Sequence, residues 1–230
     1  MINRIIAVST ASVDNEHLLD YIKELEFAKA DRLHADVMDG TVVRRATFDN
    51  NGLKVILQNT TLPTDVHLQI YQPHKQIKKY IALKPNSIIV QYDHFSYERQ
   101  LRKTLMKIQR KGIKSGLALS PNIPISYILP FVPYIDELLI LGLEPDSEGG
   151  KMFEGAYDKI KNAVDLKTRF KKDLVIQFKG GVTFENVESL YKAGVNVVVA
   201  DDVVYSCFSK SYAIDNIKKP NSNLITSKSV

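Results

Sequence analysis

The sequence predicts a single-domain (β/α)8 TIM barrel, in which eight parallel strands close into a ring inside a layer of helices. Three observations support this fold class. Short runs of β-branched and aliphatic residues recur eight times, amphipathic helical patterns lie between them, and the runs are apolar at consecutive positions. Consecutive apolar positions indicate strands that are covered on both faces, and eight such strands in one domain close most naturally into a barrel.

Each predicted strand is followed by enough chain to form a helix before the next strand begins, as parallel neighbours require. The predicted strands are residues 4–9, 32–37, 63–68, 86–92, 114–119, 136–141, 173–178 and 195–200. Helical periodicity is clearest at residues 13–30, 96–112 and 183–194, and the last two of these patterns end at a glycine. The segment 41–60 gives the weakest helical pattern.

A doubly wound open sheet is the alternative architecture. That fold usually carries a glycine-rich phosphate-binding turn directly after its first strand. The corresponding residues here, 9–14, read "STASVD" and contain no glycine. The barrel is therefore preferred, and we expect it to span residues 1–218, with residues 219–230 forming a polar C-terminal tail.

Composition limits the classes of function. The 230 residues are 44% hydrophobic, and the formal net charge of +5 is spread along the chain, which argues against a nucleic-acid partner and mildly favours an anionic small molecule. The single cysteine excludes an internal disulfide and fits a reducing compartment. No apolar run approaches the roughly 18 residues of a membrane span, and the N-terminal run is too short for a signal peptide. We expect a cytoplasmic protein without a membrane partner.

Polar residues stand at the ends of the predicted strands, where barrels carry their chemistry. They are Ser9, His34, Asp36, His67, Lys179, Asp201 and Asp202. His34 and Asp36 are two residues apart and share a face of their strand. Two histidines and a carboxylate from adjacent strands could bind a divalent cation or carry a proton-transfer step.

Each of these features also has a purely structural interpretation. His67 could be an interior histidine with satisfied hydrogen bonds. Asp39 and Gly40 could do no more than make a turn at the end of the strand. The two glycine pairs, 149–150 and 180–181, could be ordinary loop residues. Their joint position at successive strand ends favours the functional interpretation.

Four motifs resemble the ribulose-phosphate 3-epimerase family: "LHADVMDG", "DVHL", "GG" in the sixth loop and "GGV" after the seventh strand. The resemblance runs from "IIAVSTAS" to about residue 205. It implies an isomerase of carbohydrate metabolism, in the pentose phosphate context, that acts on a small-molecule sugar phosphate. It also implies a homo-oligomer.

The resemblance assigns roles to particular residues. Asp36 matches the base that removes a proton beside the ketone, and it matches a metal ligand together with His34 and His67. These are three of the family's four ligands for a divalent metal (zinc, manganese or iron). The expected substrate-binding residues are Ser9, Met38, His67, Gly149, Gly150, Gly180 and Gly181.

The sequence departs from the family pattern in three places, after the seventh strand, after the eighth strand and in the sixth loop. Lys179 stands where the family has an aspartate that is both the fourth metal ligand and the second acid/base. Asp201 and Asp202 stand where a Gly-Ser pair grips the phosphate, and carboxylates repel a phosphate dianion at close range. The sixth loop reads "EPDSEGG", which adds negative charge.

We predict that Lys179 points at Asp36 across the mouth of the barrel. An ammonium there opposes a divalent cation, so we expect no bound metal unless the family site survives. Asp36 and Lys179 are then the expected catalytic pair. The alternative is a lysine that extends from the rim into solvent.

Three functions remain open at this point. The first is an epimerase or isomerase that transfers a proton beside a carbonyl. The second is a diverged paralogue that binds a ligand or partner without catalysis. The third is an aldolase-type enzyme in which Lys179 forms a Schiff base.

Overall fold

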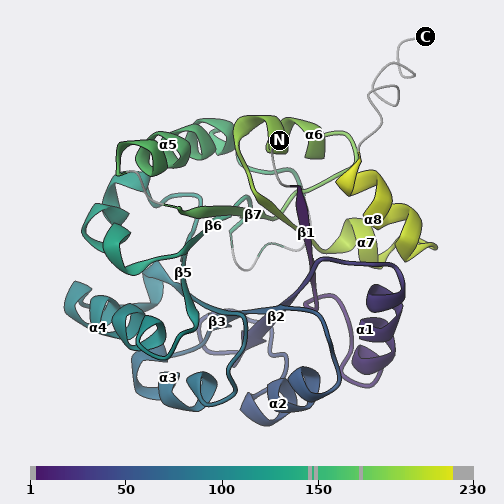
Figure 1. Cartoon of the computed structure of the whole chain (residues 1–230), viewed down its shortest axis with the longest axis horizontal. Helices are drawn as coiled ribbons and strands as arrows, with labels where there is room; N and C mark the ends of the chain where they lie inside the picture. Colours follow the sequence, from purple (N-terminus) through teal and green to yellow (C-terminus); the bar gives the residue numbers. More distant parts are fainter. Residues whose placement is uncertain (1–3, 145–146, 148–149, 171–172, 220–230) are drawn as a thin grey trace.

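The computed structural model describes residues 4–144, 147, 150–170 and 173–219. Eight parallel strands form a closed barrel in the order β1-β2-β3-β4-β5-β6-β7-β8, and helices surround it (Figure 1). The predicted (β/α)8 barrel is confirmed. The predicted tail, apart from Lys219, lies outside the described residues.

All eight strands lie within or near the predicted ranges. They are β1 (Ile5–Ser9), β2 (Arg32–Met38), β3 (Thr64–Gln69), β4 (Ser87–Gln91), β5 (Lys114–Leu119), β6 (Glu137–Leu141), β7 (Val175–Lys179) and β8 (Val197–Ala200). The barrel closes where β1 pairs with β8, from Ile5 opposite Val197 to Val8 opposite Ala200. The open-sheet alternative is thereby excluded.

Helices connect the strands on the outside. They are α1 (Leu18–Phe27), α2 (Asn50–Gln58), α3 (Pro73–Ile81), α4 (Glu98–Gln109), α5 (Ala156–Arg169), α6 (Val187–Ala193), α7 (Asp202–Tyr205) and α8 (Lys210–Lys218), with 3-10 turns η1 (Tyr92–His94) and η2 (Ile125–Tyr134). The weakly predicted helix in 41–60 is α2, which begins where the Asp49 side chain accepts hydrogen bonds from two backbone N–H groups.

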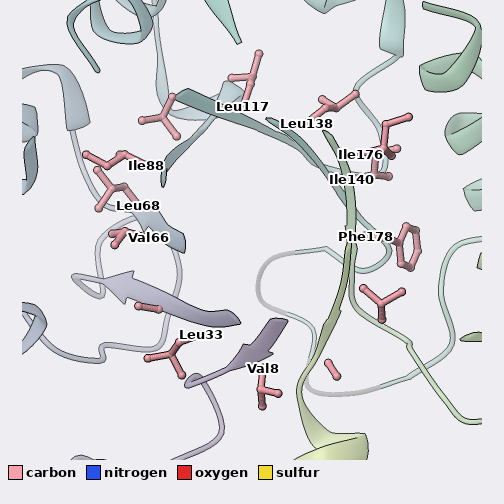
Figure 2. Close-up of a cluster of buried hydrophobic side chains, with 14 of the residues drawn as sticks. Val8, Leu33, Val66, Leu68, Ile88, Leu117, Leu138, Ile140, Ile176 and Phe178 are labelled. Atoms are coloured by element: carbon pink, nitrogen blue, oxygen red, sulfur yellow. The ribbon is translucent and has the colours of Figure 1, made fainter. Parts of the chain in front are cut away.

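Alternate residues of each strand face opposite sides of the barrel wall. Leu33, Ala35 and Val37 of β2 belong to the large apolar cluster between strands and helices, and labelled members of that cluster point outward (Figure 2). Burying each leucine or valine side chain of this cluster stabilises the fold by about 1.5–3 kcal/mol. The intervening residues, including His34 and Asp36, therefore face the barrel interior.

The interior is only partly apolar. A small cluster fills part of it: Ala7, Ile89, Ala118, Leu139, Leu141, Val197 and Val199. The remaining interior positions include buried polar and charged side chains from several strands. Parallel strands bring their C-terminal ends to one rim, so the polar residues at those ends meet there. Among the described residues, no helix is long and apolar enough to cross a membrane.

Candidate active site

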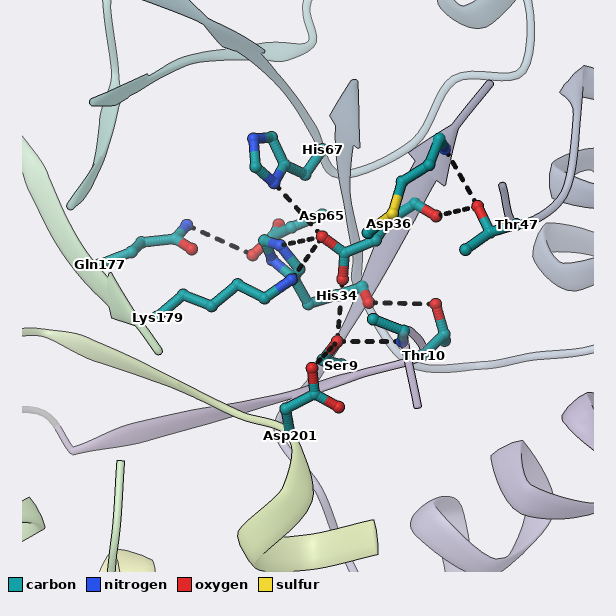
Figure 3. A network of polar contacts seen from close by, with 12 residues as sticks. Ser9, Thr10, His34, Asp36, Thr47, Asp65, His67, Gln177, Lys179 and Asp201 are labelled. Carbon is teal, nitrogen blue, oxygen red and sulfur yellow. Dashed lines mark hydrogen bonds and ion pairs between the residues drawn. The ribbon is translucent and has the colours of Figure 1, made fainter. Parts of the chain in front are cut away.

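Polar side chains converge at the C-terminal end of the barrel, with Asp36 at their centre (Figure 3). Asp36 is fully buried on β2, and its Cα lies opposite that of His67 on β3. Ser9 ends β1 and Lys179 ends β7. The structure therefore brings together strand-end residues that are far apart in the sequence.

Lys179 forms an ion pair with Asp36. Its Nζ donates a hydrogen bond to Asp36 Oδ1, and its side chain is 13% exposed. The expected contact across the barrel mouth is present, and the alternative of a lysine extended into solvent is not. A charge-assisted hydrogen bond in a water-poor site is stronger than one between neutral groups.

The surroundings keep Asp36 ionised. Burial raises the pKa of Asp36, but the nearby positive charge of Lys179, followed by the influence of His34, outweighs burial and holds this pKa well below its usual range. The neighbouring His67 behaves in the opposite way, because burial lowers its pKa to about 4. At neutral pH the centre thus holds an ionised Asp36 in contact with Lys179 and a neutral imidazole at His67.

His34 has unused hydrogen-bonding capacity. Its Nε2 lies 3.5 Å from Asp36 Oδ1, and neither of its ring nitrogens has a hydrogen-bond partner among the described residues. The side chain is completely buried. Leaving a buried polar group unsatisfied costs about 1–3 kcal/mol, so His34 is positioned to receive a polar ligand atom.

The three residues that the resemblance identified as metal ligands do come together. The ligating atoms of His34, Asp36 and His67 all lie within 4.8 Å of one another. However, Asp36 Oδ1 also accepts the hydrogen bond from Lys179. An ammonium has no lone pair for a metal, and its charge repels a cation. The residues present do not fit a divalent cation in this arrangement, because the fourth side chain is a competing positive charge.

Ser9 links Asp36 to the carboxylates that follow β8. Its Oγ lies 2.8 Å from Asp36 Oδ2 and 3.2 Å from Asp201 Oδ2. Ser12 Oγ lies 2.6 Å from Asp201 Oδ1 and 2.9 Å from Asp202 Oδ1. The negative charge that the sequence placed after the eighth strand therefore lies beside the expected substrate-binding serine.

Met38 is buried at the end of β2 and packs with Ala11 and Val43. Thr47 fixes this strand end, because its Oγ1 donates to the Asp36 carbonyl at 2.6 Å and accepts from the Met38 N–H at 3.0 Å. Thr47 was not among the site residues predicted from the sequence. It lies in the weakly patterned segment 41–60, where no strand-end rule applies.

Gly180 and Gly181 follow Lys179 with positive φ values of 100° and 68°. A Cβ on Gly181 would lie 2.5 Å from the backbone nitrogen of Met152, so only glycine permits this close approach of the two loops. Gly150 also has a positive φ, of 118°, whereas Gly149 lies outside the described residues.

Three further polar residues extend the site beyond His67: Gln91, Asp93 and Ser120. His67 Nε2 lies 3.1 Å from Gln91 Oε1, and Gln91 Nε2 donates to Ser120 Oγ at 2.9 Å. Ser120 in turn hydrogen-bonds to Asp93 Oδ2. None of the three was predicted from the sequence, although Gln91 lies near the end of the fourth predicted strand and Ser120 directly follows the fifth. Applying the strand-end rule to those two strands would have found them.

Fold and site together define the class of (β/α)8 barrels that carry a buried polar site at the C-terminal ends of their strands. Residues 5–205 match the model of the ribulose-phosphate 3 epimerase family. The chain belongs to this family.

Two bacterial relatives are similar over almost their whole length. The ribulose-phosphate 3-epimerase of Bacillus subtilis (strain 168) is 31% identical over 214 residues, which cover 93% of this chain and 97% of the relative. The ribulose-phosphate 3-epimerase of Synechocystis sp. is 30% identical over 227 residues, covering 97% of this chain and 98% of the relative.

Solved structures of more distant proteins share the fold. The 3-hexulose-6-phosphate synthase of Salmonella typhimurium aligns with a TM-score of 0.68 at 9% identity, covering 93% of this chain and 96% of that one. A mutant tryptophan synthase α-subunit of Pyrococcus furiosus aligns with a TM-score of 0.67 at 14% identity, covering 94% and 96%. At such low identity these similarities concern the barrel alone.

Proposed function

We propose that the protein is an epimerase that inverts the carbon beside the carbonyl of a phosphorylated ketose, with Asp36 as base and Lys179 as acid. The observation that carries this proposal is the ion pair between these two residues at the buried centre of the site. Family membership supports the reaction and the substrate class, because the relatives described above are named ribulose-phosphate 3-epimerases.

The reaction begins with the ionised carboxylate. Asp36 removes the proton from the carbon, the C–H electron pair forms a C=C bond, and the carbonyl oxygen becomes an enediolate oxygen. The ammonium of Lys179 donates a hydrogen bond to this developing negative charge. Lys179 then delivers a proton to the opposite face of the carbon, and the carbonyl re-forms.

The direct contact between the two side chains allows the site to reset. After one turnover Asp36 is a neutral carboxyl group and Lys179 is a neutral amine. Because Lys179 Nζ and Asp36 Oδ1 are hydrogen-bonded in the ligand-free site, the proton passes from the carboxyl to the amine without a further group. The same transfer in the other direction prepares the site for the reverse reaction.

Several neighbours bind the substrate in this proposal. His34 uses its unpartnered ring nitrogens for a substrate oxygen. Ser9, Met38 and His67 line the part of the site that holds the reacting carbon of the substrate. Backbone N–H groups of Gly180 and Gly181, with Gly149 and Gly150 of the preceding loop, hold the phosphate. We expect the phosphate to stay away from the start of α7, because two carboxylates there would repel it.

Lys179 suits proton transfer better than Schiff-base formation. Attack on a carbonyl needs a neutral amine with a free lone pair. In the ion pair Lys179 donates a hydrogen bond to Asp36 as an ammonium, which has no free lone pair. This contact therefore argues against the aldolase-type alternative.

The test is incubation of the purified protein with ribulose 5-phosphate in deuterated water, followed by proton NMR of the third carbon. We expect deuterium at that carbon and the epimeric product. Lys179→Arg keeps a positive charge but is a far weaker proton donor, so it should exchange the proton of one epimer without producing the other. Lys179→Met should lose both exchange and epimerisation.

Lys192→Met is the matched control, because Lys192 is exposed and forms an ion pair with Glu188 on the same helix. This variant should behave like the unchanged protein. Absence of label with the unchanged protein would overturn the proposal for this substrate and favour the non-catalytic paralogue. Full epimerisation by Lys179→Met would remove the lysine from the mechanism.

We also propose where the protein acts, how it assembles and where its domain ends. We expect a cytoplasmic homo-oligomer that acts in pentose phosphate metabolism and binds no nucleic acid, and the family of its relatives supports this expectation. We further propose that the domain spans residues 1–218 and that 219–230 form a tail. Gel filtration with light scattering tests the oligomeric state. Removal of residues 219–230 tests whether the domain ends at residue 218.

A further inference from the structure

A continuous line of close polar contacts leads from the centre of the site to Asp93. His67 Nδ1 lies 3.3 Å from Asp36 Oδ1, and its Nε2 lies 3.1 Å from Gln91 Oε1. The line continues from Gln91 through Ser120 to Asp93. His67, Gln91 and Ser120 are all buried, so these groups must satisfy one another.

The carboxylate of Asp93 sets the direction of every bond in this line. An ionised carboxylate only accepts hydrogen bonds, so the Ser120 hydroxyl donates its one proton to Asp93. Ser120 Oγ must then accept from Gln91, which turns the Gln91 NH2 group toward Ser120 and Asp93. The Gln91 carbonyl oxygen is left facing His67.

The position of Ser120 is itself fixed. Lys159 is buried on α5, and its Nζ donates to the carbonyl oxygens of Ser120 at 2.5 Å and Pro121 at 3.3 Å. These bonds tie the start of the loop after β5 to the outer helix. Gln91 therefore meets a hydroxyl group held in one place.

We propose that Gln91, oriented by Asp93 through Ser120, is a positioning residue that holds neutral His67 in the form with its proton on Nε2. A carbonyl oxygen accepts a hydrogen bond only from a protonated ring nitrogen, so the proton must be on the side that faces Gln91. Nδ1 then carries a bare lone pair directed toward Asp36 Oδ1. Two acceptors 3.3 Å apart need a donor from a third group. In this proposal that donor is the ammonium of Lys179, which already contacts Asp36 Oδ1.

This arrangement has a consequence for the site. Asp36 and His67 offer two acceptors to one ammonium, which holds Lys179 at the centre of the barrel mouth. With the other tautomer, His67 would donate to Asp36 and compete with Lys179 for the same oxygen. Gln91 thus acts on the reaction through His67, although it touches neither catalytic residue.

The experiment is nitrogen-15 NMR of the imidazole rings in the labelled protein, which distinguishes protonated from bare ring nitrogens. The His67 signals are assigned by their loss in His67→Gln. We expect a proton on Nε2 and a bare Nδ1 in the unchanged protein. In Asp93→Asn the new amide can donate to Ser120, Gln91 can reverse, and the form with the proton on Nδ1 should appear.

Activity provides the second readout, and this part alone rests on the proposed function. Asp93→Asn and Gln91→Leu should each lower kcat by roughly 10- to 100-fold with little change in KM, as loss of an orienting partner does. Gln109→Leu is the matched control, because Gln109 is a hydrogen-bonded glutamine at the end of α4, and its Nε2 donates to Asp136 rather than to a residue of the site. It should change neither the tautomer nor kcat.

The two readouts separate failure of this inference from failure of the proposed function. A proton on Nδ1 of His67 in the unchanged protein would overturn the inference, whatever the activity. An unaltered tautomer in both Asp93→Asn and Gln91→Leu would overturn it as well. The expected tautomer in a protein without epimerase activity would uphold the inference and count only against the proposed function.

Discussion

The barrel interior holds two polar layers with similar side chains and different organisation. The deeper layer contains Arg32, Asp65, Glu137 and Gln177, and the layer at the C-terminal end contains His34, Asp36, His67 and Lys179. In the deeper layer Arg32 Nη1 reaches Asp65 at 3.1 Å and Glu137 at 2.9 Å. Gln177 Nε2 also donates to Glu137, at 2.9 Å.

The layers differ in how charge and hydrogen bonds are balanced. In the deeper layer two carboxylates share one arginine, and burial followed by the charge of Asp65 raises the pKa of Glu137 to about 7. In the upper layer one carboxylate faces one ammonium, and its pKa is lowered. The upper layer also leaves both nitrogens of His34 unpartnered among the described residues. The deeper layer ties strands together, whereas the upper layer is organised to receive a ligand.

The largest expected effect is on catalysis in the upper layer. Asp36→Asn keeps the size of the side chain but removes the base, so the rate of exchange at the third carbon should fall by about 10²–10⁴-fold. Asp39→Asn is the matched control, because Asp39 lies just beyond the same strand and outside the site. An Asp36→Asn protein with at least a tenth of the original rate would show that another group is the base.

The next effect is on stability in the deeper layer. Arg32→Met leaves two buried carboxylates without their cation, and it should lower the free energy of unfolding by about 3–5 kcal/mol. Lys23→Met removes an exposed cation paired with Asp20, and it should change this free energy by less than about 0.5 kcal/mol. Urea unfolding measures both. Equal effects of the two substitutions would contradict the structural role of the deeper layer.

A third substitution turns the upper layer into a set of four metal ligands. Lys179→Asp changes the local charge by two units, and one unit at about 4 Å is worth ~4 kcal/mol at an effective dielectric of 20. Even a fraction of this energy should raise the affinity for zinc or manganese by about 100-fold or more. Lys179→Met, which only removes the ammonium, should give a smaller gain. Calorimetric titration that finds no gain in Lys179→Asp would disprove this electrostatic argument.

The smallest effect concerns the pH dependence of the deeper layer. Glu137 has its usual pKa of 4.5 in the unfolded chain and one of about 7 in the folded protein, so the folded protein binds more protons between these values. Its contribution to stability is therefore present below about pH 4.5 and is lost as the pH rises through about 7. Glu137→Gln removes this loss and should stabilise the protein at pH 8 by on the order of 2 kcal/mol.

The amide that Glu137→Gln introduces can also donate to Gln177 Oε1, which has no partner among the described residues. Urea unfolding at pH 5 and pH 8 measures the effect. A Glu137→Gln protein that loses as much stability as the unchanged protein between these pH values would show that Glu137 is not the responsible group.

Much of the upper layer was predictable because strand ends are easy to recognise in a sequence. Runs of apolar residues locate the strands, and a polar residue at the end of such a run must face the barrel mouth. This rule found Ser9, Asp36 and Lys179, and charge alone suggested that the last two pair. The same rule brought His34 and His67 to the rim with Asp36 and suggested a cation or proton-transfer site, and the resemblance then named these three residues as metal ligands.

The deeper layer could not be predicted in the same way. Arg32, Asp65 and Glu137 lie at or near the beginnings of their strands, where a charged residue usually faces solvent. Only closure of the barrel brings them together, with Asp65 and Glu137 on strands three apart in the ring. The orientation of Gln91 was equally inaccessible, because it depends on which partner of Ser120 is a carboxylate.

We propose that Lys179 supplies at the site the positive charge that a metal ion would otherwise supply. The most direct measurement is the rate of epimerisation of ribulose 5-phosphate before and after extensive treatment with a chelator, with elemental analysis of the same samples. We predict no stoichiometric zinc, manganese or iron and an unchanged rate. About one equivalent of metal, together with a rate that is lost on chelation and restored by the metal, would contradict this role of Lys179.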